Sequence, residues 1–411
     1  MDRAPEDQAR RDALRRDPYP AYARARETPG LTFVPELDAW LVSRDADVRE
    51  VLRRPEDFSS ANALPIEIPP APAVLAELSA GIGGFPTVVT SDGEAHQRYR
   101  APLTRGLSPS RVAAAIPFVT ERAEALVESF ASEGRVELMG AYARRLPGEV
   151  IGHLLGLATG DVPTAIDAGY RAEELLFRPL GAEEQIAAAR DVVALQHMID
   201  GYVRRRAADP RDDLTGEMVR GLAPGSPEPS RELSMDQRRE LVSNLQNLLL
   251  AGHLTTTALI GTAVLHLLRD RAQWELLCER PGLIPAAVEE AARFDAAVQA
   301  FRRVTTRPVA LAGTDLPQGT TVLVAYGSAN RDGRRHERPD EFDITRQPSR
   351  HVAFGHGVHA CPGAQLAREQ VRITLEVLTR RLPGLRLDTA QPVVMLPTLI
   401  HRSPETLPLV W

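Results

Sequence analysis

The sequence of 411 residues contains no lysine, and all 49 of its lysine-or-arginine positions are arginine. This absence excludes a pyridoxal-phosphate Schiff base, a Walker-type phosphate-binding lysine and the catalytic lysine of protein kinases. Cysteine is nearly absent as well, with only Cys278 and Cys361, far apart in the chain. Two cysteines cannot build a disulfide framework or a four-cysteine zinc or iron–sulfur site.

An excess of positive charge is also missing. The formal net charge is −6, so the chain lacks the global basic field that nucleic-acid-binding proteins show, and we expect no nucleic-acid partner. Residues 1–20 are polar and lack the apolar core of a signal peptide, which favours a cytoplasmic protein. The most apolar segment, 239–269, is interrupted by His253 and three threonines, which favours a helix buried in a soluble protein over a membrane span.

The pattern along the chain predicts a mainly α-helical protein with small β-sheets. Hydrophobic residues make up 43% of the sequence, ample for a large core. Two β-like runs around a turn precede a helix near 45–54, and 308–325 reads as short strands joined by turns. Helical periodicity marks 109–133, 183–208, 234–269 and 362–381. The apolar, proline- and glycine-rich stretch 60–90 is predicted to be a mobile loop covering something apolar, and 209–234 a polar surface connection.

One turn of the predicted apolar helix contains residues that lower helix stability. Residues 248–262 read LLLAGHLTTTALIGT, where Gly252 costs roughly 1 kcal/mol relative to alanine and the threonines crowd the preceding turn. Something other than helix stability must use this turn.

The loop HVAFGHGVHACPGAQLAR (351–368) places Cys361 between glycines and the start of a helix. Backbone N–H groups and the positive helix end favour a thiolate there. Gly355, Gly357 and Gly363 let the backbone pass close to something flat, on which Phe354 can pack. A buried, inert cysteine is the alternative.

Two charged pairs stand out at helical spacing. Glu290 and Arg293 lie at i, i+3 and can pair with each other. His96 and Arg100 lie at i, i+4 and could grip an anion together. Taken singly, each pair also fits a solvated charged helix face.

Together these segments resemble the cytochrome P450 family. FGHGVHACPG is similar to its haem-binding signature, EAAR (290–293) to its Glu-x-x-Arg motif, and AGHLTTT (251–257) to its oxygen-groove helix. ANRD (329–332) and PDEFDITR (339–346) resemble the segments ahead of the cysteine loop in soluble bacterial members. The resemblance runs from about Asp17 to the carboxyl end and implies a single P450 domain over 1–411, with a long buried helix on the distal side of the haem.

The resemblance implies roles for individual residues. Cys361 would be the axial thiolate ligand of haem b, with Phe354 and Gly355 against the cofactor. The haem propionates would be held by His96, Arg100, Arg303, His351 and His359. Glu290 and Arg293 would brace the core. His356 would be a surface residue, and Cys278 would serve in packing.

The oxygen groove implied by the resemblance comprises Ala251, Gly252 and Thr255. Gly252 would allow close approach, and the Thr255 hydroxyl would open the turn at Ala251 and hydrogen-bond bound dioxygen or its water. Where the family usually has an acid before this threonine, the chain has Leu254. Leucine cannot relay a proton, and His253 points away from Thr255 on a helix. Protons would then come through water, the threonines or the substrate, or the chemistry needs fewer of them.

The resemblance implies a monomeric, cytoplasmic monooxygenase that uses O2 on a small, largely apolar substrate of specialised metabolism. Electrons would come from a ferredoxin and an NAD(P)H-dependent ferredoxin reductase, because no Gly-x-Gly-x-x-Gly fingerprint is present. The ferredoxin would dock on a face formed by Arg98, Arg105, Arg368 and Arg372. Pocket walls are expected in 60–90, 168–182, 253–254, 295–301 and 397–401.

Two alternatives remain open. Leu254 motivates an atypical P450 that couples radicals, uses peroxide or reduces nitric oxide. The second alternative is a non-catalytic haem-thiolate sensor, against which Thr255 and the covered apolar pocket weigh.

Overall fold

The computed structural model describes residues 3–64, 70–178, 180–222, 232–347 and 349–411. The chain divides into two compact units. The first comprises Met1–Ala63, Pro117–Leu146 and Thr255–Trp411, and the second comprises Leu64–Ile116 and Pro147–Leu254. Three helices run from one unit into the other: α6 (Pro109–Glu128), α7 (Arg145–Leu154) and α11 (Met235–Arg269).

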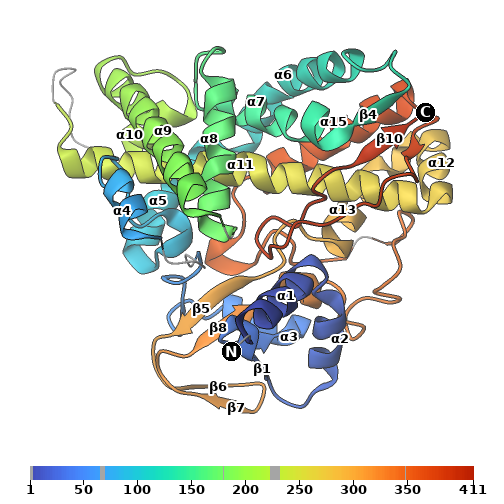
Figure 1. Cartoon of the computed structure of the whole chain (residues 1–411), viewed down its shortest axis with the longest axis horizontal. Helices are drawn as coiled ribbons and strands as arrows, with labels where there is room; N and C mark the ends of the chain where they lie inside the picture. Colours follow the sequence, from blue (N-terminus) through green and yellow to red (C-terminus); the bar gives the residue numbers. More distant parts are fainter. Residues whose placement is uncertain (1–2, 65–69, 179, 223–231, 348) are drawn as a thin grey trace. The chain divides into compact units, whose positions relative to one another are not determined.

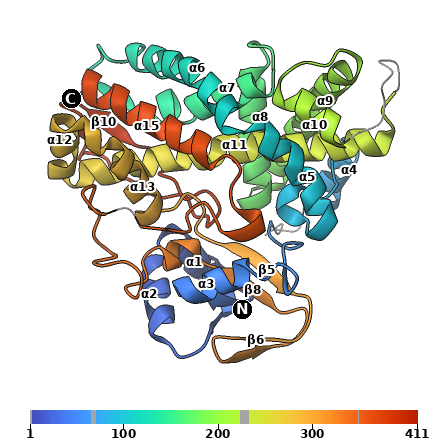
Figure 2. The same ribbon diagram turned by 180° about the vertical axis from the view of Figure 1, so that it is seen from behind.

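The first unit combines helices with all of the strands found in the described residues. Its helices are α1 (Arg3–Arg16), α2 (Tyr19–Glu27), α3 (Asp45–Leu52), α12 (Arg271–Glu279), α13 (Ile284–Phe294), α14 (Tyr326–Ala329) and α15 (Ala364–Arg381). Short helical turns are η1 (Pro35–Leu37), η3 (Met139–Ala143), η4 (Pro281–Leu283) and η5 (Gly357–His359). Helix α15 packs against α12 and α13 (Figure 2).

Three small sheets complete this unit. The largest has the order β1-β2-β8-β5-β3, from β1 (Thr32–Val34), β2 (Ala39–Val42), β8 (Thr321–Val324), β5 (Phe301–Thr305) and β3 (Phe58–Ser59). The others are β4 (Arg135–Glu137), β10 (Pro408–Val410) and β9 (Arg386–Leu387), and the pair β6 (Val309–Leu311) and β7 (Thr314–Leu316). The predicted hairpin β1–β2 is confirmed, and β2 pairs in parallel with β8, so that Trp40 lies opposite Val322.

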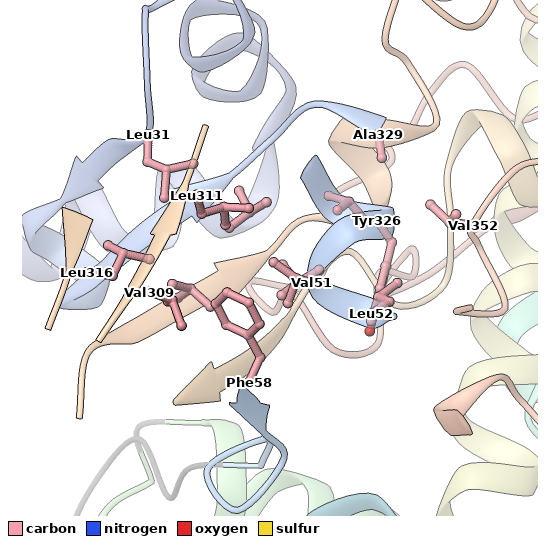
Figure 3. Packing of buried hydrophobic residues seen from close by; sticks show 14 residues of the cluster. Leu31, Val51, Leu52, Phe58, Val309, Leu311, Leu316, Tyr326, Ala329 and Val352 are labelled. Atoms are coloured by element: carbon pink, nitrogen blue, oxygen red, sulfur yellow. The ribbon is translucent and has the colours of Figure 1, made fainter. Parts of the chain in front are cut away.

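A hydrophobic cluster of the first unit lies between α3 and these strands. The cluster includes Leu52, Phe58, Val309, Leu311 and Val352 (Figure 3). Val352 lies two residues before Phe354 of the cysteine loop, and Leu52 ends α3. The hydrophobic core that packs on the largest sheet therefore also includes Val352, at the start of the cysteine loop.

The second unit contains helices and no strands among its described residues. Its helices are α4 (Pro72–Leu78), α5 (Gly93–Gly106), α8 (Val162–Phe177), α9 (Ala182–Ala208) and α10 (Leu214–Leu222), with the turn η2 (Val88–Thr90). Helix α8 packs along α9, and α5 packs on α10 (Figure 1). The predicted fold class, mainly α with small sheets, is confirmed.

Two predicted connections are partly wrong. Within 60–90, Pro72–Leu78 forms a helix whose Glu77 pairs with Arg190 of α9, while 65–69 lie outside the described residues. Within 209–234, α10 buries Leu214, Met218 and Leu222, and 223–231 lie outside the described residues. Apolar side chains at i, i+4 and i+8 share one helix face, so α10 is a core element within the predicted surface connection.

Helix α11 has 35 residues and is long and apolar enough to cross a membrane by length and composition alone. In its most apolar window, however, 78% of the helix is buried inside the protein. This burial is what a core helix requires, because its partners are protein side chains.

Candidate functional site

The loop that carries Cys361 is held by its own backbone. The Cys361 N–H donates to the Phe354 carbonyl at 2.8 Å, and the Gly355 N–H donates to the Val352 carbonyl at 2.9 Å. Gly355 and Gly357 have φ of +73° and +70°, where a side chain would be strained. A Cβ at Gly357 would also overlap the carbonyl oxygen of Leu52. The glycines therefore allow a tight loop pressed onto the end of α3.

The two cysteines have different surroundings. Cys361 is exposed and lies three residues before Ala364, the first residue of α15. Cys278 is half-buried on α12, where burial raises the pKa of its thiol. An accessible thiol at the start of a helix is the arrangement that favours a thiolate ligand. The described residues contain no group of three or more histidine, cysteine or acidic side chains that could hold a metal ion, so a single-cysteine ligand is the arrangement to consider.

The Phe354 ring is contacted by an arginine that the sequence did not connect with it. The Arg368 guanidinium lies 4.3 Å from the centroid of the Phe354 ring, a cation–π contact. Arg368 Nη2 donates to Glu289 at 3.1 Å, and His351 Nε2 lies 3.1 Å from the same carboxylate. Burial raises the pKa of Glu289, but the hydrogen bonds from His351 and Arg368 outweigh it and lower this pKa to about 2. The carboxylate is therefore ionised at neutral pH.

His351 is consequently engaged on both ring nitrogens. Its Nδ1 accepts the Ala353 N–H at 3.2 Å, while Nε2 lies on Glu289. The propionate contact expected for His351 would require one of these hydrogen bonds to break. The Nε2 atom of His359 lies 2.9 Å from the Ser60 hydroxyl oxygen.

The other predicted propionate ligands lie on separate elements. His96 and Arg100 share α5 at i, i+4, and burial, with a smaller effect from the charge of Arg100, lowers the pKa of His96. Arg303 is buried on β5, opposite Val322 of β8, and donates to the Arg302 carbonyl at 2.7 Å. His96 and Arg100 belong to the second unit, whereas Arg303 and Cys361 belong to the first. Propionate binding by these residues stays a prediction.

The accessible side of α11 coincides with the predicted oxygen-groove residues. Every residue from 248 to 268 is described, and only Leu250, Ala251, Gly252 and Thr255 are not buried. Ala251 is exposed and Thr255, one turn on, is half-buried. Thr256 and Thr257 are buried, and the Thr257 hydroxyl donates to the Ala143 carbonyl at 2.8 Å. Thr255 therefore carries the one accessible hydroxyl of the threonine run.

This turn lies within a continuous helix. Residues Met235–Arg269 are α-helical without a break, and the opening expected at Ala251 stays a prediction. A Cβ at Gly252 would lie 2.8 Å from Ile151 Cγ1 of α7. Gly252 is thus required for close packing of α7 on α11, which explains the helix-breaking residue without any ligand.

His253 and Leu254 are core residues of the second unit, although both were expected at the pocket wall. His253 is fully buried, and its Nδ1 lies 2.7 Å from the Leu249 carbonyl. Its ring meets Tyr170 of α8 edge-on, with centroids 5.2 Å apart. Leu254 is 2% exposed. Both side chains therefore serve helix packing.

Gly169 and His253 provide a test of this packing. A Cβ at Gly169 would lie 2.6 Å from His253 Cε1, and we expect Gly169→Ala to destabilise the protein by about 1–3 kcal/mol through overpacking. In a His253→Ala background the same change should stabilise by about 0.5–1 kcal/mol, because alanine is the better helix former. Thermal unfolding of the four proteins measures this reversal. Equal effects of Gly169→Ala in both backgrounds would contradict the contact.

The Glu-x-x-Arg pair is buried and anchors a long loop. Arg293 Nε and Nη2 donate to the two oxygens of Glu290 at 2.7 and 2.8 Å, and both residues are almost fully buried. Arg293 also donates to the carbonyls of Asn330 and Pro339, at 3.0 and 2.8 Å. Arg346 adds two 3.1 Å hydrogen bonds to Glu290. The predicted pairing is confirmed, and its partners give it a structural role.

The arginine face expected to receive a ferredoxin does not present unpaired charge. Arg98 forms a two-pronged ion pair with Glu240, and Arg105 lies 2.6 Å from Glu217. Arg368 is bound to Glu289, and Arg372 to Glu369 and Glu376. Glu240, Glu217 and Glu289 lie far along the chain from the arginines they bind, so local spacing does not predict these pairs. Glu369 and Glu376 lie three residues before and four residues after Arg372, a helical spacing at which pairing is expected. The prediction of this face as a positive docking patch is wrong.

Comparisons with known proteins decide the family. The cytochrome P450 family model matches residues 270–383. Cytochrome P450 107B1 of Saccharopolyspora erythraea is 34% identical over 384 residues, covering 92% of this chain and 90% of that protein. The chain belongs to the cytochrome P450 family. The 6-deoxyerythronolide B hydroxylase of the same organism is 33% identical, covering 97% of both chains.

A solved P450 structure agrees with this assignment. Cytochrome P450 CREJ in complex with (4-ethylphenyl) dihydrogen phosphate matches with a TM-score of 0.88 and 30% identity, covering 96% of this chain and 97% of that one. This protein is therefore a P450 monooxygenase with a haem cofactor bound through a cysteine thiolate. The residues fit that group, because an exposed thiol, a glycine loop and the accessible stripe of α11 are all present. A non-catalytic sensor does not agree with membership of an enzyme family.

Proposed function

We propose that this P450 hydroxylates or epoxidises a small, largely apolar molecule of specialised metabolism, with Cys361 as the axial ligand. The observation that carries the assignment is the exposed Cys361 thiol at the start of α15, in a loop that needs glycine at two positive-φ positions. The 6-deoxyerythronolide B hydroxylase, similar over nearly the whole chain, supports the substrate class by its name.

The other residues would hold the haem as follows. Phe354 and Gly355 shape the loop next to the thiol, and His96, Arg100, Arg303 and His359 are proposed propionate ligands. We assign His351 to the Glu289 network instead, because both of its ring nitrogens are engaged there. The bound haem supplies the oxidising chemistry, in which one atom of O2 enters the substrate and the other leaves as water with two electrons and two protons.

Electrons are proposed to come from a ferredoxin and its NAD(P)H-dependent reductase, with the protein acting as a cytoplasmic monomer. Arg53 and Arg350 are exposed, and neither has an ion pair among the described residues. Arg53 and Arg49 also lower the pKa of His356, after the larger effect of burial. These positive charges beside the cysteine loop suit an acidic partner and would mainly raise its association rate.

A two-step experiment tests the reaction. Compounds that shift the haem absorption in a binding screen are incubated with ferredoxin, reductase, NADH and oxygen-18 gas. We expect one labelled oxygen atom in each product molecule. Incorporation of oxygen from water would contradict the proposed monooxygenase. So would product formation with peroxide but none with O2, NADH and the redox partners.

Thr255→Ala is expected to raise the hydrogen peroxide released per NADH and to lower the product yield. The reason is that Thr255 has the accessible hydroxyl of its run and can hold a water for proton delivery where Leu254 offers no acid. Thr255→Ser keeps the hydroxyl and should retain most of the coupling. Peroxide and product are measured at equal NADH consumption. Unchanged coupling in Thr255→Ala would reject the water relay.

Unchanged coupling in Thr255→Ala would favour the second candidate, an atypical P450. Leu254 is the specific observation behind it: the position is apolar and 2% exposed, so it supplies no proton. A peroxide-using, radical-coupling or nitric-oxide-reducing enzyme depends less on delivered protons. Product analysis with peroxide or nitric oxide as oxidant separates these reactions.

A further inference from the structure

Two segments far apart in the sequence are joined by backbone hydrogen bonds in the first unit. The Gln299 N–H donates to the Leu399 carbonyl at 2.8 Å, and the Arg402 N–H donates to the Ala297 carbonyl at 2.7 Å. The pair presents half-buried apolar side chains, Ala297, Val298 and Ile400. Segments 296–301 and 397–402 therefore lie side by side, and each contributes apolar side chains that are not fully buried.

A single buried carboxylate fixes both segments. Asp295 ends α13 directly before the first segment and is 1% exposed. Its Oδ1 accepts from Arg402 Nε, in the second segment, and its Oδ2 lies 3.0 Å from His266 Nε2 of α11. Arg402 Nη1 donates in turn to the Arg16 carbonyl at 2.6 Å.

Further donors complete the environment of the same carboxylate. The Tyr19 hydroxyl of α2 donates to Asp295 Oδ1 at 2.7 Å, and Gln299 Nε2 lies 3.1 Å from that hydroxyl. Although burial raises the pKa of Asp295, Arg402 and His266 outweigh it and lower this pKa below the usual range. Asp295 is thus an ionised hub that contacts α2, α11 and both apolar segments.

The packing around Tyr19 makes the hub rigid. The Arg331 guanidinium lies between the rings of Tyr19 and Phe294, 3.6 and 3.7 Å from their centroids. Its Nε donates to the Phe294 carbonyl at 2.8 Å. Because Arg402 is only 6% exposed, losing its counterion would leave a buried charge unpaired and drive the 397–402 segment to rearrange.

We propose that Asp295 is a positioning residue for substrate selectivity, which holds segments 296–301 and 397–402 in register as one wall of the substrate pocket. This inference rests on the proposed function and on the pocket walls that the family resemblance implies at 295–301 and 397–401. Asp295 does not touch the substrate in this scheme. It acts through Arg402 and Gln299.

The test uses two haem-coordinating probes of different reach, imidazole and 4-phenylimidazole, titrated by the shift in haem absorption. Imidazole reports the haem alone, whereas the phenyl ring extends beyond it towards the walls. Asp295→Asn keeps the shape of the side chain but removes its charge. We expect 4-phenylimidazole to bind about five- to tenfold more weakly and imidazole to change by less than about twofold.

The matched control is Asp57→Asn. Asp57 is also a buried carboxylate of the first unit, paired with Arg54 and Arg307 at 2.7 and 2.6 Å, but it lies before β3 and not at the wall. Asp57→Asn should leave the ratio of the imidazole and 4-phenylimidazole affinities unchanged. A second variant, Arg402→Lys, keeps the charge but not the fork that spans Asp295 and Arg16, and should shift the ratio in the same direction as Asp295→Asn.

The outcomes separate the two proposals. An unchanged ratio in Asp295→Asn and Arg402→Lys, or an equal shift in Asp57→Asn, would overturn the positioning role while leaving the haem assignment intact. If Asp295→Asn does not fold, the Arg402→Lys ratio decides. Wild-type protein that gives no absorption shift with either azole would instead count against the proposed haem site itself.

Discussion

Glu290→Gln is expected to destabilise the protein by about 3–5 kcal/mol, the usual cost of leaving one partner of a buried ion pair uncompensated. Arg293 is 1% exposed and would keep its charge without the carboxylate that neutralises it. Glu290 also accepts the Asp343 N–H at 2.9 Å and two hydrogen bonds from Arg346. The loop from 330 to 346 should therefore loosen together with the pair.

An exposed pair with the same sequence spacing is the control. Arg338 and Glu341 also lie at i, i+3 with an N···O distance of 2.7 Å, but their side chains are more than half exposed. Glu341→Gln should cost less than about 1 kcal/mol, because exposed ion pairs are screened by water. Thermal unfolding of both variants is the measurement. Equal losses of stability in Glu290→Gln and Glu341→Gln would show that burial does not make the Glu290–Arg293 pair more stabilising than an exposed pair.

The second large effect is expected from Leu254→Glu, the change that restores the acid usual in this family. Leu254 is buried, so the new carboxyl group would be enclosed in apolar packing and should cost about 3–5 kcal/mol when ionised. The variant should lose stability and turnover rather than gain proton delivery. Leu254→Met, which conserves volume, should cost less than about 1.5 kcal/mol.

The pH dependence of this loss identifies its cause. Burial raises the pKa of a carboxyl group in the folded state above its unfolded value. The folded state then binds the proton more tightly, so the stability of the variant falls as pH rises through that window. We expect the loss relative to wild type to be smaller at pH 5 than at pH 8. A loss independent of pH, or improved coupling in Leu254→Glu, would show that the side chain reaches water.

Local patterns in the sequence predicted the four longest helices of the described residues, because an apolar face needs only neighbours along the chain. The segments 183–208 and 234–269 appear as Ala182–Ala208 and Met235–Arg269. The short helix α10 was missed because its polar flanks conceal an apolar face of only Leu214, Met218 and Leu222. The role of Gly252 was missed because Ile151, which it accommodates, lies a hundred residues earlier.

The charged contacts of the site could not be predicted in the same way. Glu289, His351 and Arg368 come from three separate segments, as do Asp295, His266 and Arg402. No spacing rule links such residues, since their proximity follows from how α13, α11 and the carboxyl-terminal segments pack. The family resemblance located the cysteine loop and the threonine run, but it did not show that Arg98 and Arg105 are neutralised by Glu240 and Glu217.

The most direct test of the central claim is the absorption spectrum of the reduced, carbon monoxide-bound protein, in wild type and in two single variants. Wild type and Cys278→Ser should both show the red-shifted band of a haem with a thiolate ligand, because Cys278 is half-buried on α12 and takes no part in ligation. Cys361→Ser should lose that band. A Cys361→Ser protein that keeps the band, or a Cys278→Ser protein that loses it, would contradict the account.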